Sequence, residues 1–399
     1  MPPRCRFAPT PRPGISICRE PFRLLFPIAL LASIAGVALW PLNHGGLLGF
    51  YPAEAHARLM IQGFVGGFAL GFLSTAFPKM IGSPPLSPVE LVLLTSTLIG
   101  CVLAHSFNLL AAGDWCFLLL WLVALHCFGA RLAFFRQSLP PPGFILAAMG
   151  IAAALVATTL LLVGRIILLS EFQRTLASLL LNEAFILGPV LGIGSFLFPR
   201  FFSAPTVPAH TKTARSWNNK ATGYFWLGIL LLATYVSQAA GSTLVAPLAR
   251  AGIVATVLLT RLPLLRRDSG TGTLSTLLRI SLILIILGVA MSIVDPATRI
   301  AAKHTLYIGG FGMLALTVAS RVTLGHSGNI ALAEGTNRAL QIVLGILLLA
   351  AATRIVAGFV PKIRISHHIY ASGLWVIAAA TWGWAVLRYV RIADPDDGP

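Results

Sequence analysis

The stretch GFILAAMGIAAALVATTLLLV, residues 143–163, contains no charged side chain and decides the fold class of this chain. A helix of about 20 apolar residues is long enough to span the hydrocarbon core of a bilayer. Similar runs recur along the sequence, separated by segments rich in Pro, Gly and Ser. We therefore predict an all-α, polytopic transmembrane bundle of about twelve helices, at residues 22–42, 59–78, 87–107, 114–134, 143–163, 175–198, 221–240, 243–262, 274–294, 301–320, 336–358 and 367–389.

The composition favours a membrane protein over a soluble enzyme. Of the 399 residues, 57% are hydrophobic and only 10% are charged, and the mean hydropathy is +0.85. A soluble domain typically has about 25% charged residues. The net charge of +17 would by itself suggest a nucleic-acid partner, but the basic residues lie between the apolar runs rather than in one patch. We interpret them as topology signals that contact anionic lipid headgroups, and we expect no nucleic-acid partner.

The distribution of charge also predicts the orientation. If the N-terminus is inside, most of the 29 Lys and Arg residues fall on the cytoplasmic side. The first apolar run has no small-residue cleavage site and is long enough to span, so we expect a retained helix. Residues 1–399 are expected to form one transmembrane domain of a bacterial inner membrane. Residues 1–21 are expected to form a basic cytoplasmic tail and residues 390–399 a short cytoplasmic tail, and the sequence leaves the oligomeric state open.

A weak internal repeat marks three of the predicted helices. Lys79, Arg200 and Arg321 each end a Gly-rich apolar helix, and each follows the previous one by 121 residues. Glycines precede these basic residues by twelve positions, at Gly67, Gly188 and Gly309, and polar residues stand five positions before the glycines, at Gln62, Glu183 and His304. The pattern predicts three four-helix units around a pseudo-threefold axis, with these helices innermost. The alternative is coincidence, because apolar helices commonly end in basic residues.

Histidine is the first residue type to follow for chemistry. At membrane depth a polar side chain is costly unless it has a partner or a cofactor, and neutral imidazole is a common ligand of haem and copper. His56 lies just outside the second predicted helix and His304 begins the tenth, so both are predicted at the outer face. His326 follows the inner end of the tenth helix, about 33 Å from His304 along a continuous helix. His56 and His304 are therefore the candidate metal and cofactor ligands, the alternative for each being a polar residue satisfied at the membrane surface.

Other polar residues are weaker candidates. Glu183 lies well inside a predicted span and is a candidate proton carrier, ion ligand or charge partner, the alternative being a protonated structural side chain. Arg321 and His326 flank a Gly-rich turn that is either an anion site or a helix end tied to lipid phosphate. The pairs Cys101–His105 and His367–His368 give only slight support for a metal. The five cysteines form no CxxC or CxxCH, and the sequence has no GxxxxGK[ST], HExxH or GxSxG.

Several longer stretches resemble one protein family along almost the whole chain. They are residues 21–26 (PFRLLF), 56–60 (HARLM), 71–78 (GFLSTAFP), 82–87 (GSPPLS), 304–328 with SRVTLGHSG at its end, 372–375 (SGLW) and 394–398 (DPDDG). On these motifs the chain resembles the NnrS family of bacterial membrane proteins. The resemblance implies a twelve-helix protein that contains haem, expected to be b-type, and copper. It further implies that nitric oxide or a related small molecule is the partner, in the response to nitrosative stress.

The sequence departs from the family pattern at several ligand-type positions. The family has a His-x-His-Glu-Met stretch, in which only His56 is retained here because Arg58 and Leu59 replace the second His and the Glu. Phe196 replaces a family Arg, and a family His is missing near Leu282. These losses make the copper site more doubtful than the haem site. The resemblance gives no settled reaction.

Two other hypotheses therefore remain open beside a haem-binding protein of the nitric-oxide response. The Gly-rich inner helices, the repeat and the buried Glu183 also fit a transporter or channel for a small solute or metal ion. The missing histidines fit a family member that has kept only a structural role.

Overall fold

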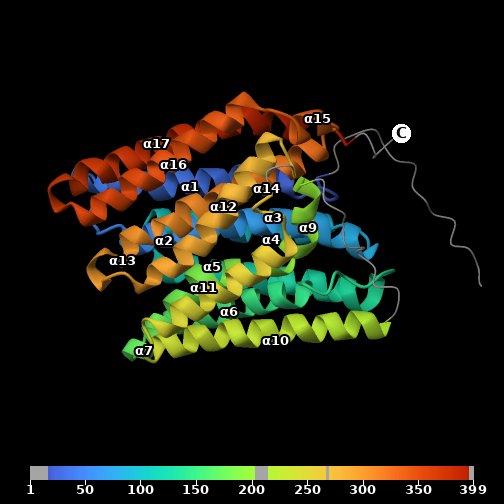
Figure 1. Ribbon diagram of the computed structural model, residues 1–399, viewed down its shortest axis with the longest axis horizontal. Coiled ribbons are helices and arrows are strands. Elements are labelled where there is room, and N and C mark those ends of the chain that lie inside the picture. The colour runs from blue at the N-terminus through green and yellow to red at the C-terminus, as the bar shows by residue number, and fades with distance from the viewer. Residues whose placement is uncertain (1–16, 203–213, 267–268, 395–399) are drawn as a thin grey trace, which may run out of the picture.

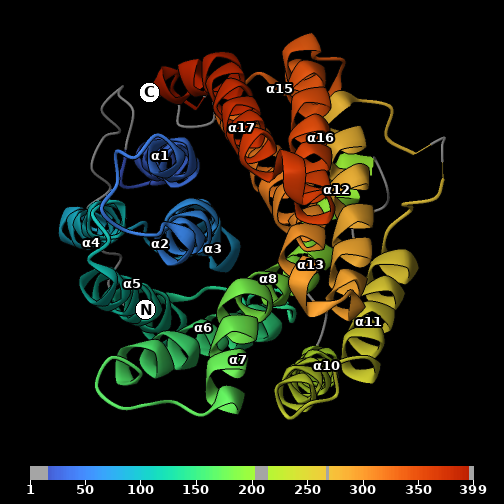
Figure 2. The same cartoon turned by 90° about the vertical axis from the view of Figure 1, so that its left-hand side faces the viewer.

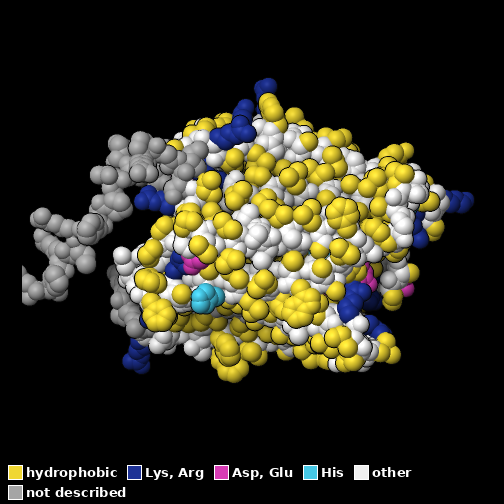
Figure 3. Space-filling view, turned by 180° about the vertical axis from the view of Figure 1, so that it is seen from behind, with side chains coloured by type: hydrophobic (Ala, Val, Ile, Leu, Met, Phe, Trp, Pro, Cys, Tyr) yellow, Lys and Arg dark blue, Asp and Glu magenta, His cyan; other side chains and the backbone are white. Residues whose placement is uncertain are grey.

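The computed structural model describes residues 17–202, 214–266 and 269–394 (Figure 1). Every regular element in these ranges is helical and none is a strand, which confirms the predicted all-α class. Twelve long helical segments follow one another, and ten of those in the described ranges are long and apolar enough to cross a membrane. The other two are α10 Ala214–Ala239, which is more polar, and α11 Val245–Arg261, which is shorter at 17 residues. Hydrophobic side chains cover most of the face seen in Figure 3, as expected of a multi-pass membrane protein.

The segments form three sectors of four, visible when the bundle is viewed end-on (Figure 2). The first contains α1 Phe22–His44; then α2 Ala53–Arg58, η1 Leu59–Val65 and α3 Gly66–Ile81; α4 Pro88–Ser106; and α5 Leu110–Ala130 with η2 Arg131–Phe135. The second contains α6 Phe144–Val163; then α7 Glu171–Leu179, η3 Leu180–Ala184, α8 Phe185–Gly192, α9 Gly194–Leu197 and η4 Phe198–Phe202; α10; and α11. The third contains α12 Thr273–Ala290 with η5 Met291–Ile293; then α13 Pro296–Ala302, η6 Thr305–Gly312 and α14 Met313–Gly325; α15 Ile330–Glu334 with α16 Arg338–Phe359; and η7 Pro361–Ile363 with α17 Arg364–Val386 and η8 Leu387–Arg391.

The sectors are joined in the same way around the ring. The last helix of each sector packs on the first helix of the next: α5 on α6, α11 on α12, and α17 on α1. The second segment of each sector is also the most buried membrane span of its sector. We call these three segments, residues 53–81, 171–202 and 296–325, the inner helices. Their arrangement agrees with the predicted pseudo-threefold layout.

The repeat glycines explain how each inner helix approaches its own sector. A Cβ atom added at Gly67 would lie 2.8 Å from Ala29 Cβ of α1, and one at Gly309 would lie 2.6 Å from Leu284 Cδ1 of α12. At Gly188 the added Cβ would lie 2.7 Å from the backbone oxygen of Leu146, in α6. Each repeat glycine therefore allows the inner helix to contact the first helix of its sector closely.

The inner helices extend beyond the apolar runs from which they were predicted. The predicted spans 59–78, 175–198 and 301–320 become 53–81, 171–202 and 296–325. Local signals explain two of the new starts: Ser170 and Gln173 form a capping box before α7, and the Asp295 side chain accepts a hydrogen bond from the Ala297 backbone N–H at the start of α13. Each inner helix also has a π-helical segment, η1, η3 or η6, a feature often found at functional sites.

Both ends of the described chain lie at the same end of the bundle. The Arg23 guanidinium donates to the backbone oxygens of Val390 at 2.6 Å and Ile392 at 2.7 Å. This contact brings the start of α1 and the end of η8 together at one end of the bundle. Glu20, within the predicted N-terminal tail, is buried at the same place.

Candidate functional site

Among the described residues, the largest group of imidazoles surrounds a cavity of about 380 Å³ at the end of the bundle away from the contact between Arg23 and Ile392. His56 of α2, His304 at the start of η6 and His368 of α17 all line it, and each comes from a different membrane-spanning segment. We call this space the histidine cavity. Its volume lies within the range of small-molecule and cofactor sites. The two sequence-predicted ligands, His56 and His304, therefore share one cavity.

One nitrogen of each predicted ligand is held by the backbone. His56 Nδ1 lies 2.9 Å from the Gly36 carbonyl oxygen, and His304 Nδ1 lies 2.7 Å from the Ile300 carbonyl oxygen. A carbonyl can only accept, so Nδ1 must carry the proton and donate in both rings. The lone pair of each neutral imidazole is consequently on Nε2, the tautomer that binds a metal through Nε2.

His56 stands 23 residues before Lys79, and His304 stands 17 residues before Arg321, so regular helices in the same register would place His56 about 9 Å further out. His56, which was expected just outside the predicted helix, lies in α2, within a helix that continues through η1 into α3. The inner helices also contain π-helical segments of different length, seven residues in η1 and eight in η6. These π-helical segments change the helical rotation and the rise per residue between each histidine and the basic residue, Lys79 or Arg321, near the end of its inner helix.

Aromatic side chains form one wall of the cavity. The Trp40 ring lies edge-on to His56 at 5.9 Å and to His368 at 5.0 Å between ring centroids. His44 is 5.7 Å from His368, also between centroids. Among the described residues, His368 Nδ1 has no hydrogen-bond partner although it is buried. Sequence reasoning gave His368 little weight because the adjacent pair His367–His368 appeared only to mark a membrane edge.

Cationic side chains also line the histidine cavity. Arg354 of α16 faces it and makes no hydrogen bond or ion pair with the described residues, whereas Lys303 is paired with Glu183. Arg58 is paired with Asp114, with 3.0 Å between Nε and Oδ1. An unpaired guanidinium beside neutral imidazoles suits a ligand that carries an anionic group.

Glu183 is a charge partner and not an isolated carboxylate. It is fully buried, accepts a hydrogen bond from Lys303 Nζ, and lies 3.5 Å from Arg250 Nη2. Arg250 is itself fully buried against the Tyr235 ring, 4.1 Å from its centroid. Lys303 immediately precedes His304, so this triad fixes the backbone beside a candidate ligand. The sequence identified Glu183 but gave no signal for its two cationic partners, Arg250 on α11 and Lys303 directly after α13.

Gln62 belongs to a second buried network. Its Nε2 donates to Asp114 Oδ1 at 2.7 Å, and its Oε1 accepts a hydrogen bond from His105 Nε2, also at 2.7 Å. Cys101 Sγ lies 3.7 Å from the same Oε1. Asp114 is thus a second carboxylate that is buried inside a membrane-spanning helix. The sequence did not indicate this, because the helix was predicted to begin at residue 114, whereas α5 begins at Leu110. Cys101 and His105 do share a helix face, and both contact Gln62 Oε1, while the buried His105 Nδ1 has no hydrogen-bond partner among the described residues.

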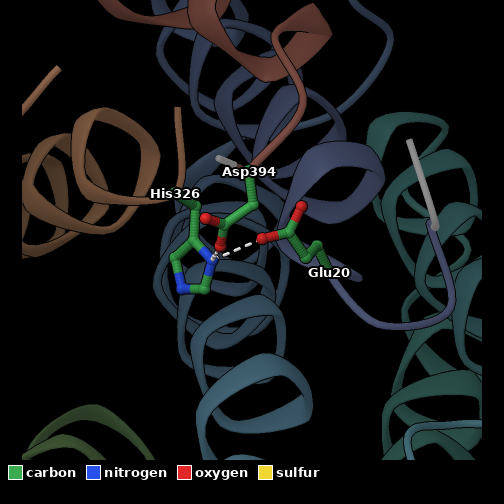
Figure 4. A group of neighbouring side chains, drawn as sticks. All are labelled: Glu20, His326 and Asp394. Carbon is green, nitrogen blue, oxygen red and sulfur yellow. Dashed lines mark hydrogen bonds and ion pairs between the residues drawn. The ribbon is translucent and has the colours of Figure 1, made fainter. Parts of the chain in front are cut away.

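Arg321 and His326 lie at the opposite end of the bundle from the histidine cavity. His326 Nδ1 contacts carboxylate oxygens of Glu20 and of Asp394, the latter at 2.9 Å (Figure 4). Among the described residues, these three form the only group of His, Cys, Asp or Glu side chains close enough to share a metal ion. Lys79 Nζ is 3.7 Å from Asp394, so an ion pair already partly neutralises this group.

The altered family positions have structural partners in this chain. Arg58, in place of the second family histidine, forms the buried ion pair with Asp114. Leu282, near the missing histidine of α12, is fully buried in the apolar core. Phe196 packs against the Arg200 guanidinium, 4.9 Å from ring centroid to Cζ. In this chain the side chains at these positions thus make packing contacts and a charge pair.

The fold and this cavity define a polytopic membrane protein with histidine side chains directed into a cavity between its helices. The family model of the NnrS protein matches residues 16–391, nearly the whole chain. The chain therefore belongs to the NnrS family. A search of curated proteins found no match.

The donors present fit haem better than copper. For haem, two neutral imidazoles from different helices, an aromatic wall and the unpaired Arg354 are appropriate donors and contacts. For copper, a site usually requires a close group of histidine or cysteine ligands. In the described ranges the close three-ligand group is Glu20, His326 and Asp394, which has two carboxylates and lies at the other end.

Proposed function

We propose that this protein binds b-type haem in the histidine cavity and acts in the response to nitric oxide. Membership of the NnrS family supports the physiological role. The observation that carries the haem site is the pairing of His56 and His304 on one cavity, each with Nδ1 bonded to a carbonyl. A bound haem would supply an iron atom that binds nitric oxide.

The residues of the chain would hold and orient that group. His56 and His304 would supply Nε2 lone pairs, and the backbone bonds at Nδ1 would fix the ring planes. Arg354 would pair with a carboxylate substituent, and Trp40 and Trp375, which also line the cavity, would exclude water from its apolar side. Because the cavity is at the end away from the termini, and the termini are proposed to be cytoplasmic, it would open toward the outer face of the inner membrane.

A visible spectrum of the protein purified in detergent tests this proposal. We expect a Soret band with stoichiometric iron, and we expect His304→Ala to lose most of it. His126→Ala is the matched control, because His126 is exposed on α5 and does not line the cavity. A colourless, iron-free preparation, or equal loss in both variants, would overturn the haem site.

The physiological role has a separate test in cells exposed to nitric oxide. His56→Ala and His304→Ala are expected to lower nitric-oxide tolerance, while His126→Ala is expected to retain it. If the two cavity variants lost haem but kept full tolerance, the structural role left open by the missing histidines would be favoured.

A transport function is the second candidate, favoured by one further observation. An apolar cavity lies along the inner helices and shares Val65 and Phe311 with the histidine cavity. The same apolar cavity shares Phe72, Leu197 and Val318 with a cavity at the other end. Flux of a small solute through proteoliposomes that depended on Glu183 and occurred without haem would support this candidate over the first.

A further inference from the structure

The three basic residues of the internal repeat meet at one cavity. Lys79, Arg200 and Arg321 each stand near the end of a different inner helix, and all three line a space of about 540 Å³ at the end that holds the termini. We call it the basic cavity. It is separated from the histidine cavity by most of the length of the inner helices.

The counter-charges at this cavity do not balance the three cations. Lys79 Nζ is 3.7 Å from Asp394 and 3.9 Å from Glu20. Glu20 is already paired with Arg23. Asp394 is the one acidic residue among the described residues that line the cavity. Counted over the described residues that line it, the basic cavity therefore carries an excess of positive charge.

The two arginines have different surroundings. Arg321 Nη2 is 3.0 Å from Glu334, whose side chain is 62% exposed, so water weakens that pair. Arg200 makes no hydrogen bond or ion pair with the described residues, and its guanidinium stacks on the Phe196 ring with 4.9 Å from Cζ to the centroid. The stacking leaves the N–H groups of Arg200 available to an acceptor.

The shape of the basic cavity limits what it can hold. Toward the centre of the bundle it meets the apolar cavity, where Phe72, Leu197 and Val318 form the shared wall. An anion would not move into that apolar space because desolvation is costly. Apolar side chains thus close the basic cavity toward the centre of the bundle, and the N–H groups of Lys79, Arg200 and Arg321 line the rest of it.

We propose that the basic cavity binds a phosphate group between Arg200, Arg321 and Lys79. Planar guanidinium groups bind phosphate oxygens through paired N–H donors, and lysine adds a point charge. The group belongs either to free phosphate or to the headgroup of an anionic lipid, since the cavity lies at a membrane surface. The site is independent of the haem proposal because it shares no residue with the histidine cavity.

Two binding measurements on the purified full-length protein distinguish the sources. Equilibrium dialysis with inorganic phosphate, after exchange into a neutral detergent, measures binding of the free ion. Native mass spectrometry of protein extracted from vesicles containing phosphatidylglycerol measures retained lipid.

Arg200→Gln is the variant of choice because it breaks no ion pair with a described residue. Arg136→Gln is its matched control: Arg136 is exposed, follows η2 at the same end of the bundle, and does not line the basic cavity. Arg321→Gln serves as a second variant. The circular-dichroism spectrum and the elution volume of each variant report that the fold is retained.

We expect Arg200→Gln and Arg321→Gln to weaken binding at least about tenfold, as for loss of a charged hydrogen bond, with Arg136→Gln unchanged. The loss appears in the dialysis if the ligand is free phosphate and in the mass spectra if it is a lipid headgroup. Binding of neither probe, or equal weakening in Arg136→Gln and Arg200→Gln, would overturn the proposal.

Discussion

Imidazole orientation is the residue-scale feature on which the candidate cofactor site depends. A histidine within a membrane span acquires a fixed tautomer when the helix backbone offers a carbonyl to one ring nitrogen. Gly36 offers one to His56 from α1, and Ile300 offers one to His304 from the preceding turn. The sequence identified these two histidines because polar residues beside apolar runs are rare. It gave His368 little weight and did not identify Arg354; both lie far along the chain and gain importance only from the shared cavity.

Glu183 provides a stability prediction at the same scale. Glu183→Gln would leave Lys303 and Arg250 as buried cations without their carboxylate, which is expected to cost about 3–5 kcal/mol. Thermal unfolding in detergent, followed by circular dichroism, is expected to show a clearly lower midpoint. Glu171→Gln is the control, because Glu171 is exposed in the first turn of the same inner helix. Equal midpoints for the two variants would contradict a charge-pairing role for Glu183.

At the scale of the element, the inner helices depend on close backbone approach. Gly188 lies against α6 with backbone atoms of Leu146 and Gly150 within 3.0 Å of where its Cβ would be. Backbone cannot move aside as a side chain can, so close packing at this glycine is more demanding than at Gly309, where the nearest atom is the end of Leu284. Close helix packing therefore explains the repeat glycines, and the packing is tighter at Gly188 than at Gly309.

Alanine substitution of the repeat glycines tests this cause. Gly188→Ala is expected to destabilise the protein by about 1–3 kcal/mol through overpacking, and Gly309→Ala by less because Leu284 can rotate. Gly345→Ala, in α16 with nothing within 4 Å of an added Cβ, is expected to be neutral or slightly stabilising. The midpoints of thermal unfolding in detergent rank the stabilities of the three variants. A decrease in midpoint for Gly345→Ala as large as that for Gly188→Ala would count against the packing explanation.

At the scale of the whole molecule, the bundle has two chemically different ends. One end contains neutral imidazoles and aromatic rings, and the other contains the basic cavity and both ends of the described chain. The positive-inside rule predicts that the basic end faces the cytoplasm. The contacts of Arg23 with Val390 and Ile392 place both ends of the described chain at one end of the bundle, but they do not select which side of the membrane that is.

Cysteine labelling in intact cells tests the orientation. In a background with the native cysteines replaced, Leu47→Cys, 74% exposed between α1 and α2, is expected to react with a membrane-impermeant maleimide. Arg136→Cys, at the basic end, is expected to react only after the membrane is disrupted. The reverse pattern would place the histidine cavity on the cytoplasmic side and contradict the proposed topology.

The 121-residue repeat predicted the inner position of three helices, with coincidence as the alternative that the sequence left open. The sequence by itself determined the membrane class and the approximate positions of the helices. These features depend on composition over about 20 neighbouring residues, which a linear pattern records directly. The tertiary structure alone decided which polar side chains meet. Lys303 and Glu183 are 120 positions apart, and Trp40 and His368 lie near opposite ends of the chain. No local pattern encodes such pairs, because each is selected by the cost of leaving a polar group unpaired inside the packed bundle.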